Sequence, residues 1–83
     1  MYTLFWSSYM RDEQNPVYGN PNIEECFRVA LKWNAWGNSL VWSFDGDGWT
    51  SNLVGISADE TGWDTEFGKW YVAKTVIDPP AIV

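Results

Sequence analysis

The sequence predicts an α+β fold of two layers, in which one helix packs on a four-stranded, mostly antiparallel sheet. One segment has the apolar spacing of an amphipathic helix, four segments have the composition or alternation of strands, and their order is β-α-β-β-β. With 83 residues, the chain is the size of one domain, so we expect residues 1–83 to form a single small acidic domain. A domain of this size has a thin core, and seven Trp, four Tyr and four Phe are more large rings than it easily buries.

The first strand is predicted over residues 2–9 (YTLFWSSY), which are rich in aromatic and β-branched side chains. The polar residues 10–20, which include Pro16 and Gly19, predict a loop. Because the next strand follows a helix, we expect it to lie parallel to the first, joined by a right-handed crossover.

The helix is predicted over residues 20–38. Asn20 or Asn22 can cap its start, and Asn22 with Glu25 has the spacing of a capping box. Gly37 with Asn38 supplies a stop signal. The apolar face comprises Ile23, Cys26, Phe27, Ala30, Leu31 and Trp33.

Two further strands are predicted over residues 39–45 and 48–57, on either side of an Asp-Gly-Asp-Gly repeat. Asp45-Gly46, Gly46-Asp47 and Asp47-Gly48 all suit a two-residue hairpin loop, and the sequence leaves this register open. All three registers place the same side chains on the core face. These are Leu40, Trp42 and Phe44 with Trp49, Ser51 and Leu53.

Residues 58–67 predict an acidic loop that carries Trp63, and residues 68–77 predict the last strand, which ends at Pro79 and Pro80. The first and last strands carry large apolar side chains on both faces, whereas one helix covers only one face of a sheet. The second face is therefore expected to form an interface, either in a homodimer or with another protein.

The charge is concentrated in the middle of the chain. The net charge is −6, and residues 33–68 contain six acids but no Lys or Arg. This distribution favours cationic partners and opposes phosphate backbones, so direct binding of nucleic acid is not expected. Acidic loops can also simply keep a tryptophan-rich protein in solution.

The Asp-Gly repeat does not have the pattern of a calcium loop. An EF-hand needs a glutamate at position 12, but counting from Asp45 or from Ser43 places Ile56 or Val54 there. The chain has no histidine, which removes the commonest zinc ligand and general base. Its one cysteine, Cys26, lies on the apolar helix face without a nearby base. We therefore predict no metal, no cofactor and no enzymatic activity.

Neither the N-terminal residues nor any other segment has the pattern of a signal peptide or membrane span, and a lone cysteine fits a reducing compartment. We therefore expect a cytoplasmic protein, in the host cytoplasm if a phage encodes it, with no membrane association.

These observations favour a small acidic protein–protein interaction module that binds a basic surface of a nucleic-acid-binding protein. Being short, acidic and without recognisable motifs, the chain resembles inhibitors encoded by phages and mobile elements, including anti-CRISPR proteins and nucleic-acid mimics, in composition only. A homodimeric structural or accessory protein and a carbohydrate-binding module are the alternatives. The predicted partner-binding residues are Asp45, Asp47, Trp49, Asp59, Glu60, Trp63, Asp64 and Glu66.

Overall fold

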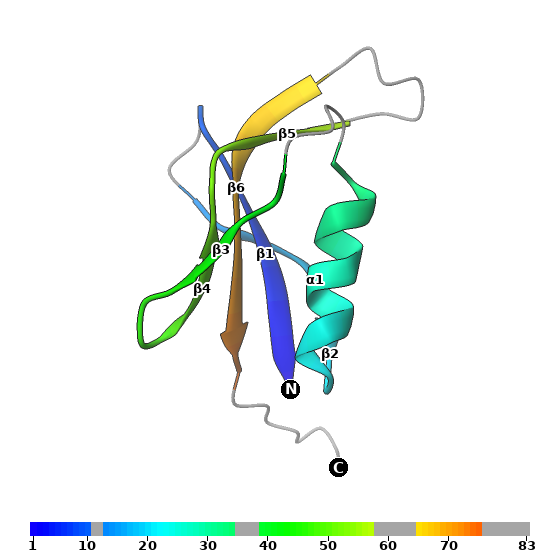
Figure 1. Cartoon of the computed structure of the whole chain (residues 1–83), viewed down its shortest axis with the longest axis vertical. Coiled ribbons are helices and arrows are strands. Elements are labelled where there is room, and N and C mark those ends of the chain that lie inside the picture. The colour runs from blue at the N-terminus through cyan, green and yellow to red at the C-terminus, as the bar shows by residue number, and fades with distance from the viewer. Residues whose placement is uncertain (11–12, 35–38, 58–64, 76–83) are drawn as a thin grey trace.

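A computed structural model describes residues 1–10, 13–34, 39–57 and 65–75. It has the expected α+β class, with one helix beside a six-stranded sheet in which every pair is antiparallel (Figure 1). In chain order, the elements are β1 (Tyr2–Ser8), β2 (Asn15–Asn20), α1 (Ile23–Lys32), β3 (Trp42–Phe44), β4 (Gly48–Ser51), β5 (Val54–Ser57) and β6 (Thr65–Lys74).

The strand order is β2-β1-β6-β4-β3, and β5 also pairs with β6. The first and last strands therefore lie side by side at the centre, in register from Tyr2 opposite Lys74 to Ser8 opposite Gly68. The prediction that the first strand lies parallel to the strand after the helix is wrong. The physical reason is that β1 and β6 are the longest strands and both carry bulky core side chains, so pairing them buries the most apolar surface.

Residues 15–20 were expected in a loop but form β2, which pairs with β1 along one border of the sheet. Pro16 is compatible with this strand because, among the described strands, β2 has a neighbour on one side only, so the missing N–H need not break a ladder. The pairing shifts register between Leu4 and Phe5, next to the position opposite Pro16.

The strand predicted over residues 48–57 is divided into β4 and β5, which pair with successive parts of β6. At the break, the Ser51 hydroxyl accepts a hydrogen bond from the main-chain N–H of Trp70 (2.7 Å). The break also shifts the alternation, so that Val54 is buried and Leu53 is exposed, the reverse of the prediction. One long strand thereby becomes two short ones that follow the curve of β6 (Figure 1).

The helix begins and ends inside the predicted range. Asn22 is the N-cap, and its side chain accepts a hydrogen bond from the N–H of Glu24 (3.1 Å). The side chain of Glu25 does not close a capping box but pairs with Arg28 (2.5 Å). The last helical residue is Lys32, and the expected stop signal at residues 37–38 lies outside the described residues.

The core lies between α1 and one face of the sheet. Its buried members are Leu4, Trp6, Cys26, Ala30, Val54, Ile56, Trp70 and Val72. The rings of Trp6 and Trp70 meet at its centre with centroids 4.8 Å apart. Leu31 and Trp33, predicted on the apolar face of the helix, are 58% and 42% exposed because the helix turns Cys26 and Ala30 towards the sheet instead.

Candidate functional site

The hairpin tip, residues 45–48, connects β3 to β4 and projects from the rest of the fold (Figure 1). The N–H of Asp45 donates to the carbonyl of Gly48 (3.0 Å), so Gly46 and Asp47 form the two-residue loop. Gly46 has φ +99°, and no non-glycine residue among those described has positive φ. The first loop residue is thus a glycine, the residue that adopts a positive φ without steric cost.

The two aspartates of the tip have different roles. Asp45 Oδ1 accepts hydrogen bonds from the N–H groups of Asp47 (3.1 Å) and Gly48 (3.0 Å), so this carboxylate holds the turn together. The Asp47 carboxylate has no hydrogen bond to any described residue, and its side chain is exposed. Asp47 is therefore the carboxylate that can contact another molecule without loss to the turn.

Beside the tip lies an aromatic band, which we define as Phe27, Trp42, Phe44 and Trp49. Phe44 packs on Trp49 (5.0 Å between centroids), Trp49 and Phe27 are nearly perpendicular (5.9 Å), and Phe27 packs on Trp42 (4.7 Å). The band thus runs from the sheet border onto α1. Phe44 is 60% exposed although it is one of the band's large rings.

The band ends in a shallow apolar hollow of about 350 Å³ between α1 and the chain leading into β3. It is lined by Phe27, Arg28, Leu31, Leu40 and Trp42. The hydrogen bond and the charge of Glu25 raise the pKa of Arg28, so the guanidinium remains cationic at one side of this hollow. The surface therefore has a carboxylate at the hairpin tip, an apolar middle and an ion pair on the helix.

Asn52 fixes the segment that leads into β3. Its side-chain amide accepts from the N–H of Val41 (2.9 Å) and donates to the carbonyl of Ser39 (2.9 Å), while its own N–H donates to Val41 (3.1 Å). The side chain thereby continues the strand pairing beyond the end of the β3–β4 ladder. This holds Leu40 and Trp42 against the helix.

The predicted site residues fall in separate places. Trp49 is half-buried against the core, beside Phe44 and Phe27. Glu66 lies at the start of β6, where its carboxylate accepts a hydrogen bond from the indole N–H of the buried Trp6. Ala73, which is opposite Gly48, lies seven residues after Glu66 along β6, about 23 Å of extended chain. Asp59, Glu60, Trp63 and Asp64 lie outside the described residues.

Leu31 and Phe44 were predicted on core faces because of their spacing, but both are exposed, and Phe27 beside them is only half-buried. In the structure, the ten-residue helix contacts β1, β2 and β6, and β3 lies at the far border of the sheet. No sequence pattern signals this, because the apolar spacing predicted a longer helix. Among the described residues, no three His, Cys, Asp or Glu side chains group as metal ligands, and no helix is long and apolar enough to cross a membrane.

Comparison with known proteins gives no match, whether with protein-family models, with curated proteins or with solved structures.

Proposed function

We propose that this chain is a small protein-binding module, and that the aromatic band with the neighbouring hairpin tip is its contact surface. The observation that carries the proposal is Phe44, a large apolar ring that is 60% exposed and stands one residue before the acidic turn. Exposed aromatic groups of this kind are typical of protein interfaces, where a few of them supply most of the binding energy.

The charge supports a basic partner. Asp47 contributes a carboxylate that has no hydrogen bond to any described residue, and the chain as a whole carries a net charge of −6. A partner that offers an apolar pocket for Phe44 bordered by Lys or Arg would match both features. Basic grooves of nucleic-acid-binding proteins have this character, and occupying one would inhibit its binding of nucleic acid. A cytoplasmic location is part of the same proposal.

The experiment is affinity capture on immobilised protein, with three variants compared. Phe44→Ala removes the exposed ring and should abolish retention of the partner at all salt concentrations. Asp47→Asn removes charge without touching the turn, so it should weaken retention mainly at low salt. Val17→Ala is the control, because Val17 is 41% exposed on β2 at the opposite border of the sheet.

A retained protein is then purified and tested for release by competing nucleic acid. If Phe44→Ala retains every protein that the wild type retains, the band is not the contact surface. If nucleic acid does not compete, the partner's nucleic-acid groove is not the target.

Self-association is the second candidate, favoured by the position of β3. This strand borders the sheet and has a β-neighbour on one side only among the described strands. Val41, just before β3, is 55% exposed, and Phe44 is 60% exposed. A second copy that pairs along β3 would cover both side chains. Light scattering tests this: a particle of the monomer mass, 9.5 kDa, at micromolar concentration would exclude a tight dimer.

A further inference from the structure

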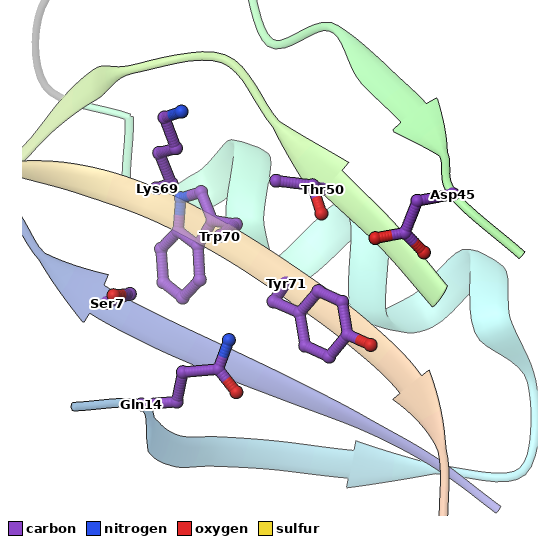
Figure 2. Close-up of a pocket in the computed structure, with 7 residues that line it drawn as sticks. All are labelled: Ser7, Gln14, Asp45, Thr50, Lys69, Trp70 and Tyr71. Atoms are coloured by element: carbon purple, nitrogen blue, oxygen red, sulfur yellow. The ribbon is translucent and has the colours of Figure 1, made fainter. Parts of the chain in front are cut away.

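The face of the sheet opposite α1, here called the open face, carries a hollow of about 360 Å³. Because side chains alternate along a strand and Trp6, Trp70 and Val72 point into the core, their neighbours point away from the helix. Figure 2 shows the side chains around this hollow, with α1 behind the strands. They include Ser7, Gln14, Asp45, Thr50, Lys69 and Tyr71.

Tyr71 is the aromatic side chain of the open face that lines the hollow. A Cβ atom on Gly48 would lie 2.9 Å from both Cζ and Oη of Tyr71, so the ring lies across the backbone of β4, where only glycine leaves room for it. Phe5 packs beside it, with ring centroids 6.0 Å apart. The ring is thus held from two sides, and Figure 2 shows it in front of the strands, on the side of the sheet away from α1.

The polar groups around this ring have unused hydrogen-bonding capacity. Within the described part of the chain, the side chains of Ser7, Gln14, Thr50, Lys69 and Tyr71 have no hydrogen-bond partner. They come from four separate places, namely β1, the segment before β2, β4 and β6. The pairs Ser7–Lys69 and Thr50–Tyr71 are directly opposed across neighbouring strands, which keeps their side chains close together.

The charges in the hollow balance. Lys69 supplies one positive charge and Asp45 one negative charge, so the site favours neither an anion nor a cation. Hydroxyl, amide, ammonium and carboxylate groups together offer both donors and acceptors. The volume is at the small end of ligand sites, which span about 300–1,000 Å³.

We propose that this hollow binds a neutral, hydroxyl-rich ligand of the size of one sugar ring. The apolar C–H face of the ring lies on Tyr71, and its hydroxyls bond to Thr50, Ser7, Lys69 and Gln14. A free monosaccharide and the terminal sugar of a glycan share this chemistry. The site is separate from the aromatic band, since Tyr71 and Phe44 lie on opposite faces of the sheet.

The test is an NMR titration of the whole chain with a panel of monosaccharides and their methyl glycosides. We expect at least one sugar to give saturable shifts at the amides of Thr50, Lys69 and Tyr71, with dissociation constants on the order of millimolar. Binding of the free sugar but not of its glycoside would identify a site for free monosaccharide, and binding of both would identify a site for a glycan terminus.

Variants locate the binding. Tyr71→Ala should lower the affinity by about fivefold or more, and Thr50→Val by about two- to tenfold. Tyr9→Ala and Ser43→Ala are matched controls, because Tyr9 is 73% exposed and neither residue lines the hollow. Phe44→Ala should also leave sugar affinity unchanged, which separates this proposal from the protein-binding one. The amide spectrum of each variant reports whether it folds.

Three results would overturn the proposal. They are the absence of saturable shifts with every sugar, shifts confined to the aromatic band, and an unchanged affinity in the folded Thr50→Val variant. Preferential binding of an anionic sugar phosphate over the neutral sugar would contradict the argument from balanced charge.

Discussion

Gly68→Ala should destabilise the fold strongly, because β1 and β6 approach each other too closely at this position for a side chain. A Cβ atom on Gly68 would lie 2.2 Å from the carbonyl oxygen of Ser7, 2.8 Å from Cζ2 of Trp6 and 2.9 Å from Cα of Ser8. Two of these atoms belong to the backbone of the central strand pair, so no side-chain rotation removes the clash. The strands would have to separate where Trp6 packs on Trp70.

The magnitude follows from two opposing effects. Overpacking costs about 1–3 kcal/mol, and contacts with backbone place this case at the upper end. Replacing glycine by alanine in a strand stabilises the fold by about 0.5–1 kcal/mol, because the unfolded chain loses conformational freedom. The free energy of unfolding should therefore fall by about 2 kcal/mol, which lowers the Tm by roughly 8–16 °C in a domain of this size.

Urea denaturation followed by tryptophan fluorescence measures this loss. Gly19→Ala is the matched control, because Gly19 also lies in a strand but its Cβ would only reach ordinary contact, 3.5 Å from Met1 Sδ and 3.6 Å from the carbonyl of Tyr2. We expect Gly19→Ala to leave the stability unchanged or slightly raised. A Gly68→Ala variant within about 0.5 kcal/mol of the wild type would refute the reasoning.

Two further predictions concern polar groups that face the core. Glu66→Ala leaves the buried indole N–H of Trp6 without its partner, so the free energy of unfolding in urea denaturation should fall by about 1–3 kcal/mol. Glu66→Gln keeps an acceptor and should lower it less; an equal fall in the two variants would argue against this role of Glu66. Burial raises the pKa of the Cys26 thiol, so its reaction with a thiol reagent should be much slower in the native state than in urea. Because the folded-state pKa is the higher one, this thiol stabilises the fold below its ordinary pKa, and that contribution is lost as the pH rises through the folded value. A native labelling rate equal to that in urea would contradict the burial of Cys26.

The hairpin turn is a feature that neighbouring residues alone predict. The Asp-Gly repeat predicted a two-residue turn, and the turn exists. Three registers were open because each pair of residues suits such a loop. With Gly46 as the first loop residue, the positive φ falls on a glycine. A type I′ loop made of Asp45 and Gly46 would need a positive φ at the aspartate as well. The side chain of Asp45 then adds two hydrogen bonds to the chosen turn.

The errors share a different cause. The helix, its cap at Asn22 and the presence of a strand near either end of the chain were predictable because they depend on neighbouring residues. The bounds of the last strand were wrong: β6 begins at Thr65, inside the predicted acidic loop, because residues 65–68 pair with β5. The parallel pairing, the loop over residues 10–20 and the unbroken strand over residues 48–57 were wrong, because each depends on residues far along the chain. β2 forms because it can pair with β1. β4 and β5 are separate strands because they pair with successive parts of β6.

The candidate site was predictable only in part. The sequence indicated an acidic hairpin with aromatic residues on either side and placed Trp42 and Phe44 on the core face. Trp42 does pack against the core, whereas Phe44 is 60% exposed. Glu66 was predicted as a partner-binding residue on the acidic loop, apart from Asp45 and Asp47 at the hairpin tip. In the structure, Glu66 is engaged with Trp6, about 23 Å along β6 from the hairpin. The open-face hollow has no sequence signature at all, since its side chains come from residues 7–71.

The sequence by itself determined the class of the fold, the capped helix, the acidic turn and an excess of aromatic rings, because periodicity, capping and charge are readable within a few residues. Only the tertiary structure decided which rings are buried. That outcome depends on strand order and on how far one ten-residue helix reaches across the sheet, and it leaves Phe44 exposed beside Asp45 while Trp70 is enclosed.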